Sequence, residues 1–311
     1  MKYLKKIISS LITIFIITIL IFVIFQILPG DAATLKAGME DEFNMAEVYK
    51  KTMGIDKPLY KQYFEWVYNI LRFDLGKSYI YENYTVVDLI ISRLKITLSL
   101  GLISLFFIVI ISIPMGIVLY KNQNNKIGNF LKIFIQINIS TPSFWIGIVL
   151  MYLFCLKLRI LPVIVSIDWN LPLKTLRALI LPVIAISMGS ISIIMRYLAN
   201  ELADQKEKDY VVFAVAKGTS MNKIIYKHML KNSLIPVITI IGMIILNLLS
   251  GSIIIENVFG LSGIGSLLIN AVDQRDIPLT QGIVFFFSLT VIIINLCVDT
   301  LYSVVDPRVS K

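Results

Sequence analysis

The chain has 311 residues, of which 57 % are hydrophobic and 16 % are charged. A water-soluble domain cannot hide so much apolar surface, so the composition excludes a soluble globular protein and indicates that lipid covers part of the chain. The formal net charge of +9 is better explained by the excess of Lys and Arg on the cytoplasmic side of membrane proteins than by nucleic-acid binding. Cys155 and Cys297 both lie inside apolar runs, which indicates neither a disulfide framework nor a metal-binding pair.

Six apolar runs are long enough to cross a bilayer, which takes about 20 helical residues at 1.5 Å each. The first, residues 7–28, exceeds the apolar core of a cleavable signal peptide, so we expect a retained helix. In the third run, Thr141–Pro142 predicts a kink. We therefore expect an all-α polytopic membrane protein with six transmembrane helices, the later five at residues 94–120, 133–156, 176–197, 234–255 and 282–304.

An even number of spans places both termini on one side of the membrane. Basic residues at the N-terminus, around the polar loop 121–126 and in the charged stretch 199–232 favour the cytoplasmic side. The short loop between the third and fourth spans is also basic, which counts against this orientation. The expected organisation is a transmembrane helix at 1–28, an extracytoplasmic segment at 29–93, a five-helix core at 94–304 with a cytoplasmic loop at 199–232, and a cytoplasmic tail at 305–311.

The extracytoplasmic segment contains an amphipathic stretch at residues 59–71. Tyr60, Tyr63, Phe64 and Val67 recur near helical spacing, which predicts a helix. Two placements of this helix fit the pattern equally well. It lies at the membrane interface, or it packs as an ordinary surface helix on the bundle.

The densest charge in the protein lies at residues 199–232, between two apolar runs. Residues 210–217 contain no helix breaker, and Gly218 stands where a helix often ends in a left-handed residue. Thr219 or Ser220 can then cap a second helix. That helix carries a basic stripe on one face, formed by Lys223, Lys227 and Lys231. An elbow of two short helices suits the groove of a partner protein better than a catalytic pocket, and the stripe fits lipid headgroups or an acidic partner surface equally well.

The elbow resembles the cytoplasmic "EAA" loop of binding-protein-dependent ABC importer permeases and, more narrowly, that of the dipeptide, oligopeptide and nickel group. The pattern A-x-A-K-G followed by H-x-L-x-N-x-L-I-P is matched by Ala214, Ala216, Lys217, Gly218, His228, Leu230, Asn232, Leu234, Ile235 and Pro236. The acidic residue of the general motif is absent, because Val212 stands in its place.

Three further regions resemble the same group, in an order that covers nearly the whole chain. The external segment reads G-I-D-x-P-L at 54–59 and D-L-G-x-S at 74–78. The loop before the sixth span reads G-I-G-x-L-L at 263–268 and R-D-x-P-x-x-Q-G at 275–282, although Leu261-Ser262 replaces the usual Trp-Pro before it. The C-terminal end reads N-L-x-x-D-x-x-Y at 295–302, followed by D-P-R at 306–308.

The resemblance implies a type I ABC importer permease fold with both termini cytoplasmic. It implies three kinds of protein partner besides the lipid bilayer: a second homologous permease subunit, two cytoplasmic ABC ATPase subunits and an extracytoplasmic solute-binding protein. It also implies that residues 211–226 dock on an ATPase, with Ala214, Ala216, Lys217, Gly218, Thr219 and Ser220 as the coupling residues. The cargo would be peptides, nickel or metal-chelate complexes.

No chemistry of its own is expected from this chain. A phosphate-binding G-x-x-x-x-G-K-[ST] loop is absent from the sequence, so ATP and magnesium are expected in the partner ATPase subunits, with no cofactor, catalytic residue or metal site in this chain.

Polar residues inside apolar runs are costly and usually face the bundle or a water-filled path. The candidates for lining a pathway are Gln136, Asn138, Asn247 and Asn295. Asp299 is the carboxylate that lies well inside an apolar run, about one turn from the end of its helix. A structural role in helix pairing is favoured for it. The alternative is an ion-driven secondary transporter that uses Asp299.

Overall fold

The computed structural model describes residues 2–27, 57–81, 83–163, 167 and 169–305. Within these ranges the regular structure is helical apart from one isolated antiparallel bridge between Lys77 and Thr85. The expectations for residues 28–56, which include the start of the 54–59 motif, and for the tail at 306–311 lie outside the described residues.

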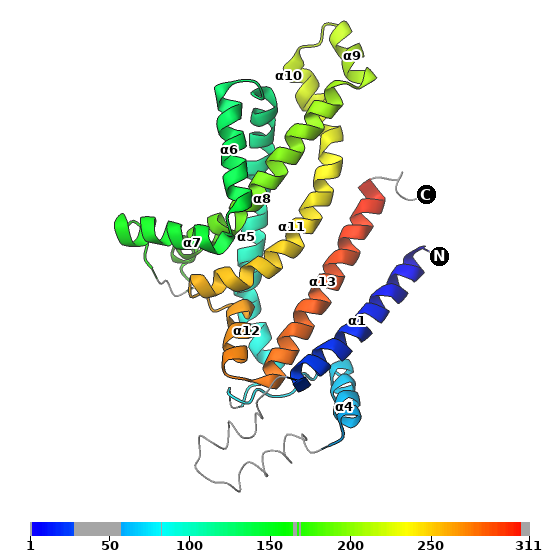
Figure 1. Cartoon of the computed structure of the whole chain (residues 1–311), viewed down its shortest axis with the longest axis vertical. Helices are drawn as coiled ribbons and strands as arrows, with labels where there is room; N and C mark the ends of the chain where they lie inside the picture. Colours follow the sequence, from blue (N-terminus) through cyan, green and yellow to red (C-terminus); the bar gives the residue numbers. More distant parts are fainter. Residues whose placement is uncertain (1, 28–56, 82, 164–166, 168, 306–311) are drawn as a thin grey trace. The chain divides into compact units, whose positions relative to one another are not determined.

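The chain divides into two compact units, one formed by residues 1–95 and 262–293 and the other by residues 96–261 and 294–311. The first unit contains α1 (Lys2–Ile27), α4 (Leu59–Leu71) and α12 (Ile264–Asp273), together with the start of α5 (Val86–Lys121) and most of α13 (Ile277–Val305) (Figure 1). Its small core joins α5, α12 and α13 through Val86, Leu89, Ile90, Ile264, Leu267, Ala271, Leu279 and Ile283.

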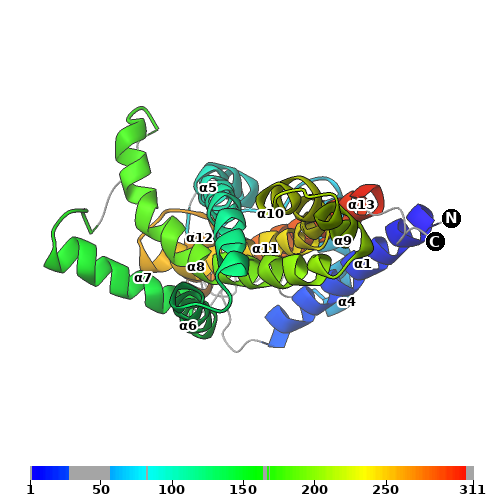
Figure 2. The ribbon, with the colours of Figure 1, turned by 90° about the horizontal axis from the view of Figure 1, so that it is seen from above.

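The second unit is built around the long helix α8 (Pro172–Lys206). This helix packs against α6 (Lys126–Ser140), α7 (Ser143–Met151) and α11 (Leu230–Val258), as the view along the other axis also shows (Figure 2). Short elements complete the unit: the π-helical turns η1 (Tyr152–Lys157) and η2 (Ile225–Met229), α9 (Asp209–Ala216) and α10 (Met221–Ile224). Fully buried α8 side chains, among them Ile194, Met195 and Leu198, form the centre of its core.

Five helices of the described chain are long and apolar enough to cross a membrane, and they match five of the six predicted spans: α1, α5, α8, the continuous helix 221–258 and α13. Each of them extends past at least one end of its predicted apolar run. The helix α5 begins eight residues early because Thr85 caps it: the Asp88 N–H donates to Thr85 Oγ1 over 3.1 Å, and Thr85 Oγ1 donates to Asp88 Oδ2 over 2.6 Å.

The third run bends at the predicted position, Thr141–Pro142, but as a break between two helices rather than as a kink within one helix. Residues 126–140 and 143–157 form two arms that meet at 104° (Figure 1). The cause is Pro142, which disfavours helical backbone at the residue before it. Thr141 (ψ 127°) and Pro142 (ψ 140°) are both extended. Each arm has 15 residues, or about 22 Å, which is too short to span a bilayer alone.

Candidate functional site

The elbow at residues 209–229 ends its first helix as the sequence predicts. Gly218 has a φ of +75°, the left-handed conformation that glycine adopts without strain. Its N–H donates to the carbonyl of Val215 over 2.9 Å, and the Thr219 N–H donates to the carbonyl of Ala214 over 3.1 Å. This pair of bonds is a Schellman motif, which satisfies the last carbonyls of α9 and fixes the direction in which the chain leaves it.

The second helix of the elbow begins without the predicted side-chain cap. Ser220 occupies the N-cap position with extended backbone, but neither its hydroxyl nor that of Thr219 caps a helix N–H. The prediction of a cap by either residue is therefore wrong. Since Ser220 is exposed, solvent can satisfy the orphan N–H groups of this turn.

The elbow presents an apolar surface to its surroundings. Val212, Phe213 and Val215 of α9 are 59 %, 61 % and 53 % exposed, and Tyr226 of η2 is 56 % exposed. Cations border these side chains: Lys217 Nζ lies 4.5 Å from the centre of the Phe213 ring, and the basic stripe is exposed along its length at Lys223, Lys227 and Lys231. Exposed apolar patches with polar rims mark protein or membrane contact sites.

The inner side of the elbow is fastened to the second unit. Val211, Ile224, Ile225 and Met229 are buried in its core. The ammonium of Lys121, at the end of α5, donates to Asn222 Oδ1 over 2.9 Å and lies 4.8 Å from the centre of the Tyr226 ring. These contacts, together with chain continuity into α8 and α11, mean that the elbow cannot shift without displacing the helices behind it.

Two of the four predicted pathway residues come together. Asn138 of α6 and Asn247 of α11 line one cavity of about 200 Å³, whose other polar lining residues are Thr141, Ser143 and Ser190. Thr141 and Ser143 flank the proline of the broken span, so the break brings hydroxyl groups to this cavity. Asn138 is buried, and its Nδ2 donates to the carbonyl of Phe134 over 2.8 Å.

The other two pathway candidates lie elsewhere. Gln136 is exposed on α6 with its Nε2 3.4 Å from Ser140 Oγ, and Asn295 is exposed on α13. Neither residue lines the cavity. Asp299 is exposed on α13 as well, and the structural role expected of it stays a prediction.

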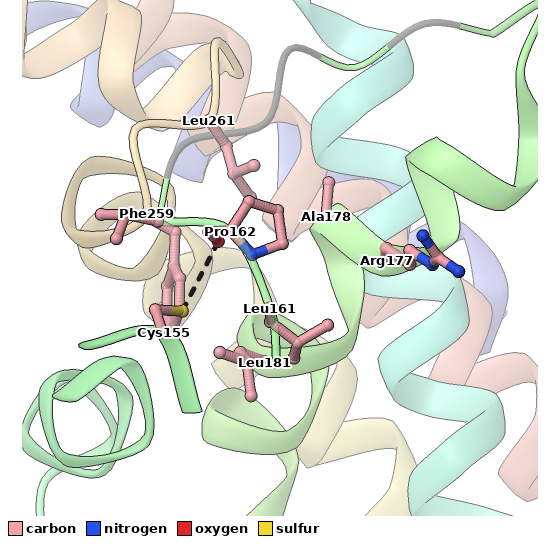
Figure 3. Close-up of a pocket in the computed structure, with 9 residues that line it drawn as sticks. Cys155, Leu161, Pro162, Arg177, Ala178, Leu181, Phe259 and Leu261 are labelled. Atoms are coloured by element: carbon pink, nitrogen blue, oxygen red, sulfur yellow. Dashed lines mark hydrogen bonds between the residues drawn. The ribbon is translucent and has the colours of Figure 1, made fainter. Parts of the chain in front are cut away.

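A second, much smaller pocket surrounds Cys155 and has a volume of about 20 Å³ (Figure 3). The Cys155 thiol donates to the carbonyl of Pro162 over 3.5 Å. Leu181 and Phe259 close the space, and the guanidinium of Arg177 points away from it. There is room for about one water molecule, so this pocket is a packing defect rather than a ligand site.

Two buried carboxylates escaped the sequence interpretation. Glu256 of α11 is fully buried, and its Oε1 accepts a hydrogen bond of 2.7 Å from Thr97 Oγ1. It directly follows the predicted end of the fifth span at residue 255, so the predicted span does not include it. Asp276, which precedes α13, is also fully buried, and the preference for carboxylates at helix starts is the signal that identifies its position.

Asp276 joins two of the family-like motifs. Its carboxylate accepts hydrogen bonds from the Ser78 hydroxyl and from the N–H groups of Tyr79 (3.1 Å), Ile80 (3.4 Å) and Leu279 (3.2 Å). Ser78 ends D-L-G-x-S, and Asp276 belongs to R-D-x-P.

This arrangement also affects Tyr79. The pKa of its hydroxyl is raised to about 12, mainly by burial and to a smaller extent by the nearby Asp276 carboxylate. We call this arrangement of Asp276 with residues 78–80 the latch.

The apolar helices of the described residues are those of a multi-pass membrane protein, and comparison with known proteins specifies which kind. Residues 112–311 match the family of binding-protein-dependent transport system inner membrane components, and residues 1–101 match the N-terminal region of such membrane components. The chain therefore belongs to this family, whose members are permease subunits of ABC importers and lie in the inner membrane. This confirms the resemblance seen in the motifs and supports the ABC importer interpretation over the ion-driven alternative that uses Asp299.

Individual relatives span the full length of the chain. It is 33 % identical over 307 residues to a candidate peptide transport system permease protein of Brucella abortus, with 98 % of each chain covered. It is also 33 % identical over 305 residues to the glutathione transport system permease protein GsiC of Escherichia coli K12, with 98 % of this chain and 97 % of that protein covered.

Solved structures support the fold. The inward-facing MetNI methionine ABC transporter matches with TM-scores of 0.55 and 0.58 in two crystal forms, at 16 % identity. The first match covers 71 % of this chain and 97 % of that one. The type I importer permease fold predicted for the chain is thereby confirmed.

Proposed function

We propose that this chain forms one half of the transmembrane pathway of an importer for short peptides, and that residues 211–226 are its coupling contact to a cytoplasmic ATPase subunit. The names of the relatives, peptide and glutathione transport permeases, support peptide-like cargo over nickel or metal chelates. The other subunits of the proposed complex are a second homologous permease, a second ATPase and an extracytoplasmic solute-binding protein.

The observation that carries the coupling role is the apolar surface of the elbow. Val212 and Phe213 are exposed, although the chain around them is held rigidly by the Schellman motif and by the buried inner side. Aromatic and aliphatic side chains on a rigid element are typical anchors for a partner groove. Ala214, Ala216, Lys217, Gly218, Thr219 and Ser220 frame these anchors.

The proposed motion follows from how the elbow is fastened. When the two ATPase subunits close on ATP, the docked elbows are drawn together. Because α9 continues from α8, and α10 leads into α11, each elbow carries those helices with it and the pathway turns outward. Hydrolysis, which is assigned to the ATPase subunits, resets the position. For this chain, transport is a rigid-body movement and not a chemical step.

Removing one anchor tests the coupling role. The tagged chain, extracted in mild detergent, is expected to co-purify with a second permease and with Walker-motif ATPases, identified by mass spectrometry. Phe213→Ser should retain the permease but lose the ATPases at least about tenfold, because an anchor is worth about 1.4 kcal/mol or more. The matched control is Ile127→Ser, which changes a side chain that is 56 % exposed at the start of α6. Recovery of ATPases with Phe213→Ser at the level of the wild type would contradict the proposal.

We further propose that the cavity lined by Asn138 and Asn247 contacts the cargo during passage. Its polar lining consists of neutral amide and hydroxyl groups, which can exchange hydrogen bonds with peptide groups without the desolvation cost of a charge. Asn247→Leu should lower peptide uptake several-fold while the amount of assembled complex stays the same. Gln136→Leu, on an exposed position outside the cavity, is the control. Equal uptake by the two variants would exclude the cavity from the pathway.

A further inference from the structure

Helix α4 has three different faces along its 13 residues. Each residue of a helix is turned by 100° from the one before it. This places five half-buried residues on one face: Gln62, Tyr63, Trp66, Val67 and Ile70. A second face is apolar and open: Tyr60, Phe64, Tyr68 and Leu71 are 61 %, 66 %, 52 % and 74 % exposed. The third face is polar and exposed, with Lys61, Glu65 and Asn69. A helix that packed on a bundle in water would need only two faces, one apolar and one polar.

The half-buried face packs on α1 (Figure 1). The Tyr63 hydroxyl lies 3.0 Å from Thr18 Oγ1, and the ring of Phe22 lies 5.4 Å from that of Tyr63 and 6.4 Å from that of Trp66, centre to centre. Thr18 is 4 % exposed beneath this contact. The position of α4 is therefore fixed to two residues of a membrane-spanning helix.

These two residues lie well inside the apolar run of α1. The helix ends at Ile27, so Phe22 and Thr18 are about 8 and 14 Å from its end at 1.5 Å per residue. A hydrocarbon core is about 30 Å thick, and amphipathic helices lie about 5–10 Å below the headgroup boundary. The contact is therefore at the depth of the upper acyl chains, and the open aromatic face cannot meet bulk water there.

We propose that α4 is immersed in the leaflet at the C-terminal end of α1, which is the outer leaflet in the predicted orientation, with its aromatic face against lipid and its polar face toward the headgroups. The neighbouring part of α1 is apolar and open as well: Ile19, Val23 and Ile24 are all exposed. Tyr, Trp and Phe are the side chains enriched at this level of a bilayer. Lipid thus covers the exposed apolar side chains of both α1 and α4.

The end of α4 fits the same environment. The Arg72 guanidinium lies 4.2 Å from the centre of the Tyr68 ring, which leaves its N–H groups available to a headgroup phosphate. Phe73 follows with a φ of +62° and is 88 % exposed. A bulky residue in the left-handed region is strained, and burial of the Phe73 ring in lipid offsets that cost.

A photoreactive probe can identify the occupant in the assembled complex in its own membranes. p-Benzoylphenylalanine is placed at Phe64 on the aromatic face or at Asn69 on the polar face of the full chain, and the irradiated protein is weighed by mass spectrometry. The Phe64 probe is expected to give phospholipid adducts, and the Asn69 probe at least about fivefold fewer. A probe at Phe15, which is 57 % exposed on α1, serves as the second reference.

Three outcomes would overturn the proposal. The Phe64 probe forms its adducts with a second permease or with a solute-binding protein; the two α4 positions label lipid equally; or the Phe64 probe labels no lipid in a preparation where the Phe15 probe does. The first outcome would assign the aromatic face to a protein partner instead.

Discussion

The latch and the elbow differ in whether their contact groups are used within the chain or left exposed. In the latch, one buried carboxylate accepts four hydrogen bonds, three of them from residues about 200 positions away along the chain. In the elbow, the bonds that set the shape run between residues three to five positions apart, and the apolar side chains stay outside. The latch uses its polar group internally, whereas the elbow leaves its contact groups for another molecule.

The contrast indicates which parts of the chain are complete by themselves. A buried, saturated carboxylate leaves nothing to offer a partner, so the latch serves the chain's own architecture. The elbow keeps its shape through its own hydrogen bonds, but its exposed Val212 and Phe213 are left for contact with a partner. Stability and function should therefore respond to different substitutions in the two regions.

The largest effect is expected from breaking the latch. Asp276→Ala leaves the Ser78 hydroxyl and three N–H groups without their acceptor, at a cost of about 3 kcal/mol or more in the free energy of unfolding of the first unit. Limited proteolysis should then cut the purified variant quickly near residues 77–81. Asp273→Ala, an exposed carboxylate three residues earlier, is the control and should resist like the wild type. Similar resistance in the two variants would show that the latch carries little stability.

A smaller and more selective effect is expected at the elbow. A Cβ at Gly218 would meet no atom within 4 Å, so only the positive φ demands glycine there. Gly218→Val should strain the turn by about 1–2 kcal/mol and lower uptake per ATP hydrolysed several-fold in the assembled complex. Gly218→Asn, which tolerates the left-handed conformation, should keep most of the coupling. Equal losses in the two variants would mean that the angle of the elbow is not what matters.

Most of the fold was predictable because lipid imposes a simple rule on sequence. A bilayer requires about 20 consecutive apolar residues per helix, and five of the six predicted spans exist as such. The third bends at the predicted residues, but the extent of the bend was not predictable, because Pro142 is compatible with a kink and with a complete break and local sequence does not distinguish between them. The helix at 59–71 was predicted with the bounds that the structure gives it, because its aromatic and apolar residues recur clearly at helical spacing.

The candidate site was predictable where it is local and unpredictable where it is not. The end of α9 at Gly218 follows from a few adjacent residues, whereas the missing cap at Ser220 depends on solvent access that a pattern does not encode. Asn138 and Asn247 share a cavity, and Gln136 and Asn295 do not, because which side of each helix faces the others is decided by packing. Glu256 was missed since it stands one residue past an apolar run.

The latch also has a consequence for how the protein is made. Ser78 and Asp276 are 198 residues apart, and a ribosome adds about 5–20 residues per second. The segment at 77–81 thus waits on the order of ten seconds or more for its acceptor, through the insertion of four further apolar stretches. During that time its N–H groups have no carboxylate to bind, so the latch can close only when the loop before the last span has emerged. In a chain truncated before residue 276, the segment at 77–81 would stay permanently without this acceptor, and quality-control proteases could recognise an incomplete permease by it.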